Sequence, residues 1–236
     1  MSGLDCFFKG FALIFSAGLR RYVIIPLLIN TVLFAGMVYW AFTFFDGWIN
    51  RLIGYLPDFL YFLSWFLWVM FFIALMAFLF YTFTMLANII AAPFNALLSV
   101  QVEKRERGGV LNHPEVPFYR LVPRTLAREL GKLVYYLPRL IGLVILTVIP
   151  VINLLAPVLW VLFGAWMMTI QYADYAADNN GQSFFALRSA MSRKRSDSLL
   201  FGIAVYVMMA VPLVNLLVLP AAVAGGSVLW LKKLDT

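Results

Sequence analysis

The chain has 236 residues, of which 64% are hydrophobic and 12% charged, and its formal net charge is +7. Soluble domains are roughly half apolar and a quarter charged, so the composition excludes an ordinary soluble protein and predicts one integral membrane domain over residues 1–236. The cations lie between apolar runs, where membrane topology and anionic lipid headgroups account for them, so we expect no nucleic-acid partner.

Residues for catalysis, cofactor binding or metal binding are scarce. Cys6 is the only cysteine and His113 the only histidine. Neither a disulfide nor a cysteine metal site is therefore possible within the chain, and a Ser-His-Asp triad would depend on one loop histidine. No glycine-rich nucleotide-binding motif is present. We expect neither an enzyme nor a bound cofactor or metal ion.

Residues 4–17 form an amphipathic segment, which Asp5 and Lys9 interrupt, so we do not expect a cleavable signal peptide. The first membrane span is expected at residues 22–45, which are apolar and long enough to cross a bilayer. A short polar turn, "DGWINR", is then expected to lead into a second and longer apolar run.

Gly18, Leu19, Arg20 and Arg21 stand between the amphipathic segment and the first span. Gly18 permits a tight turn, and the first N–H groups of a helix have no partner within it. Such N–H groups together with two guanidinium groups suit an oxyanion. Membrane helices also often begin with cations that anchor them, and the residues alone leave both interpretations open.

The second span is expected over residues 59–107. At about 1.5 Å per residue this stretch is longer than a bilayer is thick. We therefore expect it to cross the membrane and to continue as a cytoplasmic extension. Its final part, "SVQVEKRERGG", becomes polar gradually, and Gly108 and Gly109 are expected to end the helix.

Cations recur every fourth residue along residues 118–132, beside an apolar face of helical spacing. This pattern predicts a basic amphipathic helix at the membrane surface, and contact with lipid headgroups is its first interpretation. The alternative is a vestibule that concentrates anions. Its candidate residues are Arg120, Arg124, Arg128 and Lys132.

Two later pairs of apolar runs, residues 133–170 and 199–231, have junctions of similar sequence, "IPVINLLAP" and "VPLVNLLVLP". Neither junction carries a charge that would lie among headgroups on the far side. One arm of the second pair, residues 199–211, is also too short to cross a bilayer. We therefore expect two re-entrant hairpins, with short full spans as the alternative. Paired broken segments of this kind are typical of transport sites.

Three polar residues within these hairpins are candidate pathway residues. Asn153 and Asn215 occupy corresponding places in the two junctions, and we expect them to cap the returning half-helices, whose N-termini would favour an anion. They either cap buried helix ends only or also line a pathway. Arg139 lies inside an apolar arm, where it is either functional or extends to the interface.

Charge placement predicts the topology. Lys and Arg are frequent before the first span, over residues 104–139 and around the second hairpin, whereas residues 46–58 carry one cation, Arg51, against two aspartates. Both termini and both hairpin bases are therefore expected in the cytoplasm. The predicted fold class is all-α, an integral membrane protein with two long transmembrane helices, two re-entrant helical hairpins and an amphipathic surface helix. Since two crossing helices do not enclose a pore, we also expect a homo-oligomer.

Several long and unusually composed stretches resemble the bacterial CysZ sulfate permease family. They are "GLRRYVIIPLLIN", "ANIIAAPFNALLSVQVEKR", "VPRTLAREL", "YYLPRLIGL", "LAPVLW", "QYADYAADNN" and "VPLVNLLVLP", and the resemblance spans nearly the whole chain. One departure is Ala176, where the family usually has proline, and we expect it to loosen the turn after the first hairpin. More distant eukaryotic relatives, the etoposide-induced protein family, are less clearly transporters.

The resemblance implies a bacterial inner-membrane protein that admits sulfate for cysteine synthesis without an ATP-hydrolysing subunit. It also implies two long transmembrane helices and two partly inserted hairpins. The family's sulfate-binding motif, Gly-Leu/Ile-Arg-Arg, falls on Gly18, Leu19, Arg20 and Arg21. The leading hypothesis is thus a sulfate channel or permease with sulfate and membrane lipids as partners. The alternative is a non-transport membrane scaffold or lipid-interacting assembly protein, in which those arginines bind lipid phosphate.

Overall fold

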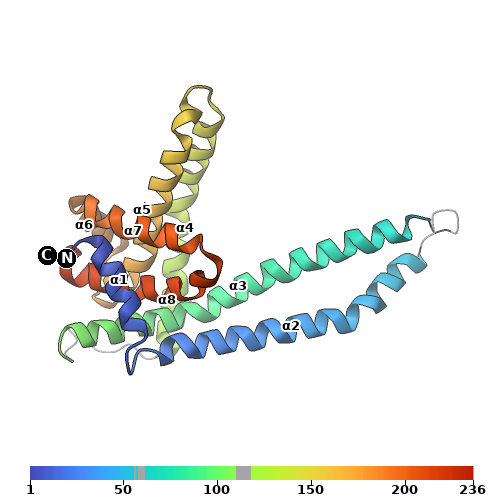
Figure 1. The fold of residues 1–236 in the computed structure, drawn as a ribbon, viewed down its shortest axis with the longest axis horizontal. Coiled ribbons are helices and arrows are strands. Elements are labelled where there is room, and N and C mark those ends of the chain that lie inside the picture. The colour runs from blue at the N-terminus through green and yellow to red at the C-terminus, as the bar shows by residue number, and fades with distance from the viewer. Residues whose placement is uncertain (56, 58–61, 110–117, 236) are drawn as a thin grey trace. The chain divides into compact units, whose positions relative to one another are not determined.

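The computed structural model describes residues 1–55, 57, 62–109 and 118–235, and gives the backbone alone for residues 46, 118, 120–122, 124–125 and 212–213. His113 lies outside the described residues. Within them the chain is helical and contains no strand (Figure 1). The elements in chain order are α1 (Gly3–Ile14), α2 (Arg21–Gly54), α3 (Ser64–Glu106), α4 (Phe118–Val148), the 3-10 helix η2 (Ile152–Leu155), α5 (Ala156–Asn179), α6 (Phe184–Arg193), α7 (Arg195–Met209), α8 (Pro212–Leu229) and the π-helical turn η3 (Trp230–Leu234).

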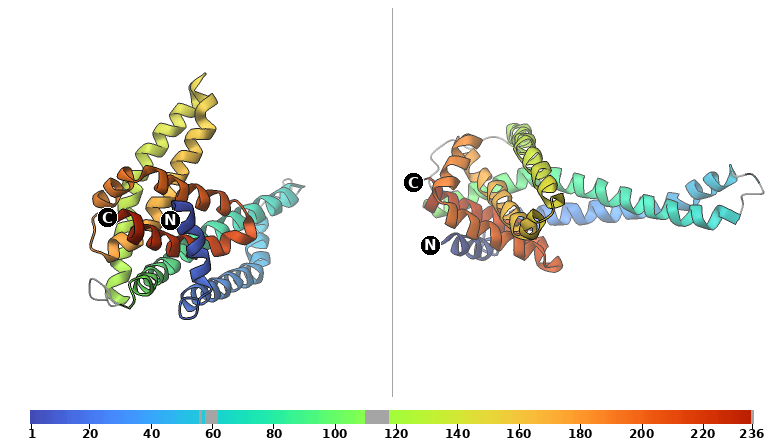
Figure 2. Two further views of the ribbon diagram at one scale, coloured as in Figure 1. Left: turned by 60° about the vertical axis from the view of Figure 1, so that its left-hand side comes forward. Right: turned by 90° about the horizontal axis from the view of Figure 1, so that it is seen from above.

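The chain forms two compact units. The hairpin unit is Ile24–Ala91, which holds most of α2 and the first two thirds of α3 as two helices lying side by side (Figure 2). The core unit is Met1–Val23 with Ala92–Thr236, and it contains all the other helices.

In the hairpin unit, the predicted polar turn "DGWINR" is instead helical, because α2 continues to Gly54. Ala41, Phe45 and Ile49 recur every fourth residue on one face of α2 and are buried together with Leu75 and Leu79 of α3. The polar residues of this segment alone would predict a turn. Burial of the apolar face keeps the segment helical instead.

The other end of α3 stops where the glycines predict it. The helix ends at Glu106, and Gly108 and Gly109 follow with φ angles of 71° and 98°. The N–H of Gly109 donates to the carbonyl of Lys104 at 2.7 Å. Glycine adopts this left-handed conformation without a Cβ penalty, so the predicted helix end is confirmed.

Helix α1 begins with a reciprocal cap. The Ser2 hydroxyl accepts from the N–H of Asp5 at 3.2 Å, and the Asp5 carboxylate accepts from the N–H of Ser2 at 2.6 Å. These hydrogen bonds lower the pKa of the Asp5 carboxyl. One turn along, Cys6 is fully buried, and burial raises the pKa of its thiol to about 11. Helix α1 is thus fixed at its start and buried along one face.

The centre of the core unit is made by α1, α5, α7 and α8, which approach one another through small residues. A Cβ added at Gly10 of α1 would overlap the backbone of Ala221 and Gly225 in α8, and one at Gly202 of α7 would overlap the carbonyl of Ala165 in α5. Close backbone approach of this kind is typical of membrane helix packing. It holds α1, and with it the segment that follows α1, against a rigid bundle.

Helix α4 differs from the sequence-based expectation. It runs without a break from Phe118 to Val148, so the predicted surface helix (residues 118–132) and the first arm of the predicted hairpin (from residue 133) form one helix. Together with α5 it makes a helical hairpin that projects from the rest of the core unit (Figures 1 and 2). Ala176, expected to affect a turn, lies inside α5, which continues to Asn179.

The two junctions of similar sequence have unlike structures. The first is a 3-10 helix introduced by Val151 with φ 73°, and the N-cap of α5 is Leu155. At the second, the N-cap of α8 is Val211. Neither cap residue makes a side-chain capping hydrogen bond. The expectation that Asn153 and Asn215 are N-caps is therefore wrong, because a proline in the first turn sets the start of each helix.

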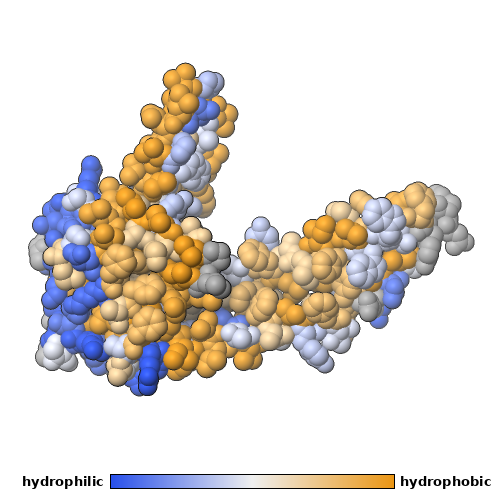
Figure 3. Space-filling model, in the orientation of Figure 1, coloured by the Kyte–Doolittle hydropathy of each residue, from blue (hydrophilic) through white to orange (hydrophobic). Residues whose placement is uncertain are grey.

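Five helical segments among the described residues are long and apolar enough to cross a membrane. They are Arg21–Gly54, Ser64–Glu106, Leu126–Val148, Ile152–Asn179 and Val214–Leu234. Hydrophobic residues cover most of the projecting α4–α5 hairpin, and hydrophilic residues gather on the side of the core unit that carries both termini (Figure 3). The predicted all-α membrane fold is confirmed at this level.

Candidate functional site

The segment between α1 and α2 forms a turn, which we call the Gly18 turn (residues 16–21). Gly18 has φ 89° and a Cβ there would meet no atom within 4 Å, so the backbone conformation and not space requires glycine. Leu19 is only 4% exposed and packs into the core. The turn therefore buries one residue and presents Arg20 and Arg21 to the outside.

Hydrogen bonds within the Gly18 turn satisfy only some of its N–H groups. The carbonyl of Ser16 accepts from the N–H of Leu19 at 3.2 Å and from the N–H of Arg20 at 3.3 Å. Among the residues that the structure describes, the N–H groups of Gly18 and Arg21 have no acceptor. The sequence-based expectation of free N–H groups is thus wrong for Leu19 and Arg20, whose N–H groups are taken up by the turn itself.

A third arginine joins the Gly18 turn from α3. Nη1 of Arg105 donates to the Ser16 hydroxyl at 2.8 Å and to the Ala17 carbonyl at 3.4 Å. Nη2 of Arg21 donates to the Tyr22 hydroxyl at 3.0 Å, and its guanidinium lies 4.9 Å from the ring centroid. Nothing in the spacing along the chain pointed to Arg105, which is 89 residues from Ser16.

No carboxylate among the described residues matches the positive charges at this turn. In the described part of the chain, Arg20, Arg21 and Arg105 have no carboxylate partner. Three guanidinium groups supply donors in fixed, planar geometry, and two free N–H groups add to them. This arrangement is chemically suited to a small divalent oxyanion.

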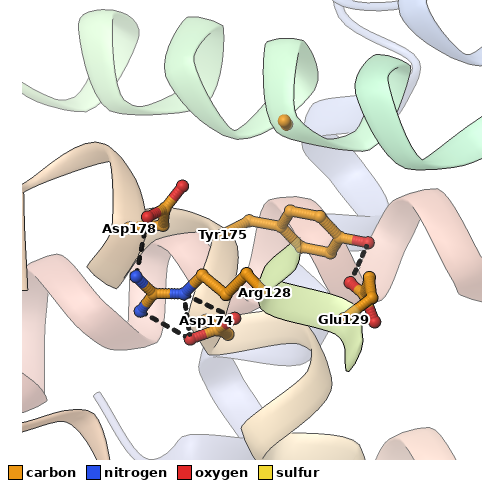
Figure 4. A pocket seen from close by; sticks show the side chains of 6 residues that line it. Arg128, Glu129, Asp174, Tyr175 and Asp178 are labelled. Carbon is orange, nitrogen blue, oxygen red and sulfur yellow. Dashed lines mark hydrogen bonds and ion pairs between the residues drawn. The ribbon is translucent and has the colours of Figure 1, made fainter. Parts of the chain in front are cut away.

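A second group of charges, which we call the charged cluster, joins α4 to α5 (Figure 4). Nε of Arg128 donates to both carboxylate oxygens of Asp174 at 2.9 Å, and its Nη1 donates to Asp178 at 2.6 Å. Asp174 is 2% exposed. The members of the cluster are Arg128, Glu129, Lys132, Gln171, Asp174, Tyr175 and Asp178.

Lys132 completes the charged cluster. Its ammonium lies 2.9 Å from Glu129 and 3.1 Å from Asp174, and the Tyr175 hydroxyl donates to Glu129 at 3.3 Å. Two cations thus face three carboxylates, so the described cluster is not cationic. The structure corrects the vestibule hypothesis for Arg128 and Lys132, because α5 supplies carboxylates that match them.

The other candidate residues are dispersed. Only the backbone is described for Arg120 and Arg124, and their vestibule role stays a prediction. Asn153 is exposed in η2 and Asn215 lies half-buried in the first turn of α8. Arg139 is exposed on α4, where its Nη1 donates to the carbonyl of Tyr135 at 2.8 Å. In the described residues no cluster of His, Cys, Asp and Glu is placed to hold a metal ion.

Comparison with known proteins identifies the family. Residues 6–220 match the family model described as sulfate transporter CysZ/etoposide-induced protein 2.4. The chain belongs to this family. It is 46% identical over 236 residues to a sulfate transporter CysZ of Pseudomonas fluorescens, and the alignment covers 99% of this chain and 94% of the relative. It is 48% identical to one of Pseudomonas syringae pv. tomato, over 95% and 90% of the two chains.

The relation extends beyond that genus. A sulfate transporter CysZ of Pectobacterium atrosepticum is 42% identical, over 98% of this chain and 85% of the relative. The matched residues 6–220 include the whole Gly18 turn, Arg105 and the charged cluster. Both groups of charges are therefore parts of the CysZ-family domain.

Proposed function

We propose that this chain imports sulfate across the bacterial inner membrane for assimilation into cysteine, without ATP hydrolysis, and that sulfate binds at the Gly18 turn. The observation that carries the proposal is the gathering of Arg20, Arg21 and Arg105 at one exposed turn without a carboxylate partner among the described residues. The relatives named as sulfate transporters supply the identity of the anion.

The chemistry of sulfate fits this turn. Sulfate is a tetrahedral dianion whose oxygens accept several hydrogen bonds at once, and arginine provides two parallel donors to such a group. The N–H groups of Gly18 and Arg21 add neutral donors, and that of Arg21 lies at the start of α2, where the helix dipole favours an anion. Because the turn is exposed, sulfate would exchange with solvent without a rearrangement of the core.

The proposed membrane arrangement has two long spans, α2 and α3, and two re-entrant hairpins. In the first hairpin, residues 140–148 carry no charge, and α5 has a run of buried residues from Ala165 onward. The projecting part is therefore nine residues, or about 14 Å of helix, roughly half of the hydrocarbon thickness. This length favours an insertion from one side over a full crossing.

The remaining parts of the proposal follow the charge pattern. Both termini lie on the side where Lys and Arg are enriched, which is the cytoplasm by the positive-inside bias. Two crossing helices per chain require a homo-oligomer to enclose a path. Asn153 and Asn215, near the two junctions, are the candidate polar residues along it, and Arg120 and Arg124 are candidates for its vestibule. Arg139 packs on the ring of Tyr135, and we do not place it along this path.

The test is radiolabelled sulfate uptake into liposomes that contain the purified protein. We expect saturable uptake by the wild type and loss of that uptake in Arg20→Ala/Arg21→Ala at equal incorporation, because the variant lacks two of the three guanidinium groups at the turn. The matched control is Arg193→Ala/Arg195→Ala, which removes two exposed charges elsewhere in the core unit and should retain uptake.

Each outcome of this experiment is decisive. Equal uptake by the wild type and Arg20→Ala/Arg21→Ala would move the sulfate site away from the Gly18 turn. Loss of uptake in the control as well would indicate a general charge effect. No uptake above empty liposomes, with a monodisperse and folded sample, would support the alternative of a non-transport scaffold or lipid-interacting assembly protein.

A further inference from the structure

Two arginines from different helices converge on one aromatic ring. Cζ of Arg139 in α4 lies 3.5 Å from the ring centroid of Tyr135, and Cζ of Arg188 in α6 lies 4.4 Å from it. The ring of Phe184 packs edge-on against Tyr135 at 5.5 Å between centroids. We call Tyr135, Arg139 and Arg188 the Tyr135 site. Cation–π contacts orient both guanidinium groups at this ring.

The two charges of the Tyr135 site face no carboxylate within the part of the chain that the structure describes. In the described part of the chain neither Arg139 nor Arg188 has a carboxylate partner, whereas Arg107 and Arg128 of the same unit each contact two carboxylates. Arg139 uses one donor on the carbonyl of Tyr135 and keeps the others, since a guanidinium carries five. Two like charges held near one ring repel each other, and an anion between them would remove that repulsion.

The surroundings of the Tyr135 site are apolar and exposed. Val134 is 76% exposed and Leu137 49% on α4, and Phe185 is 72% exposed on α6. Beyond Arg139, residues 140–148 carry no charge and are the part of α4 nearest the hairpin tip. Cations next to an exposed apolar surface are typical of the boundary between lipid headgroups and acyl chains. A soluble anion such as sulfate would leave this apolar surface uncovered.

We propose that the Tyr135 site binds the phosphate of an anionic phospholipid. Arg139 and Arg188 donate to the phosphate oxygens, and the exposed side chain of Phe185 lies among the acyl chains. The site fixes the depth of the α4–α5 hairpin, because the phosphate lies at the headgroup level and residues 140–148 lie below it. This role is independent of sulfate transport, since it requires no sulfate at the site.

The experiment uses the full-length protein in phosphatidylcholine vesicles with a small fraction of spin-labelled phosphatidylglycerol or, separately, spin-labelled phosphatidylcholine. The motionally restricted signal reports lipid bound to the protein. We expect wild type to prefer phosphatidylglycerol, and Arg139→Gln/Arg188→Gln to lower that preference by about tenfold, since each cation near the surface contributes to anionic lipid binding. Arg193→Gln/Arg195→Gln, a loss of two exposed charges at the last residue of α6 and the first residue of α7, should keep the preference.

A second arm separates lipid phosphate from sulfate. Equilibrium binding of radiolabelled sulfate should be equal in the wild type and Arg139→Gln/Arg188→Gln. Loss of sulfate binding, with lipid preference retained, would overturn the proposal and make the site part of the sulfate path. Displacement of the labelled phosphatidylglycerol by millimolar sulfate, or an equal loss in the Arg193→Gln/Arg195→Gln control, would also overturn it. The single variants Arg139→Gln and Arg188→Gln carry the test if the double variant is not monodisperse.

Discussion

The Gly18 turn and the charged cluster place the same side chain, arginine, in opposite environments. Arg20, Arg21 and Arg105 lie at an exposed turn and have no carboxylate partner among the described residues. Arg128 has 18% of its side chain exposed and contacts Asp174 and Asp178. The comparison teaches that the partner of a cation, and not its position in a basic stripe, separates an arginine that is available to an anion from one that is part of an internal ion pair.

The largest expected effect comes from removing a matched charge. Arg128→Met removes the guanidinium that contacts the buried carboxylates of Asp174 and Asp178. We expect a loss of about 3 kcal/mol in the free energy of unfolding, at the lower end of the range for buried pairs because Arg128 is partly exposed and Lys132 still contacts Asp174. For a chain of this size the midpoint of thermal unfolding should fall by roughly 10 °C. Intrinsic tryptophan fluorescence of the detergent-solubilised protein measures it.

The control for Arg128→Met is a variant that removes exposed arginines from the Gly18 turn. Arg20→Ala/Arg21→Ala removes two exposed arginines and should change the free energy of unfolding by less than about 0.5 kcal/mol. Arg128→Met combined with Asp174→Leu should be milder than Arg128→Met alone, since the buried carboxylate that has lost its hydrogen bonds to Arg128 is then removed as well. Equal destabilisation by Arg128→Met and Arg20→Ala/Arg21→Ala would contradict the distinction between the two regions.

The next effect comes from the backbone of the Gly18 turn. Gly18→Ala places a Cβ on a residue with φ 89°, which costs about 1–2 kcal/mol in this conformation. The turn should then relax and displace Arg20 and Arg21, so we expect sulfate affinity to fall by about tenfold, measured by equilibrium binding. Gly142→Ala is the control: the same change in α4, with no atom within 4 Å of the new Cβ, should leave affinity unchanged. An unchanged affinity in Gly18→Ala would show that the turn does not position the arginines.

Local chemistry explains what the sequence predicts well. Gly108 and Gly109 end α3 because left-handed φ angles suit glycine. The turn at Gly18 is placed by the same rule. These features depend on a few neighbouring residues, so they can be predicted without knowledge of the fold. The binding role of Arg20 and Arg21 came from the family resemblance, and it stays a proposal.

Long-range pairing explains what the sequence did not predict. Arg128 was interpreted as part of a basic surface stripe because its partner Asp174 is 46 residues away. A signal existed: Asp174 and Asp178 are four residues apart, on one face of a helix, with only Tyr and Ala between them, and buried carboxylates require cations. Arg105 had no comparable signal, since its contact with Ser16 depends on how α3 packs against the bundle.

The smallest expected effect concerns the arginine that sequence patterns did not reveal. Arg105→Gln removes one of the three guanidinium groups at the Gly18 turn but leaves residues 18–21 unchanged. We expect sulfate affinity to fall by about threefold to tenfold, the range for one charge-assisted contact at an exposed site. Because Arg105 is exposed and its partners are a hydroxyl and a carbonyl, the midpoint of thermal unfolding should stay within about 2 °C of the wild type.

The control for Arg105 is Arg193→Gln, an exposed arginine whose guanidinium also contacts a serine hydroxyl, that of Ser189 at 3.3 Å. We expect Arg193→Gln to bind sulfate as the wild type does. A difference in sulfate affinity between the two variants would then be due to the position of Arg105 and not to the loss of one positive charge in general. Raising the ionic strength should narrow that difference, because exposed charges are screened. If Arg105→Gln binds sulfate with unchanged affinity, the anion contacts only Arg20 and Arg21, and Arg105 serves to hold Ser16 and Ala17 in the turn.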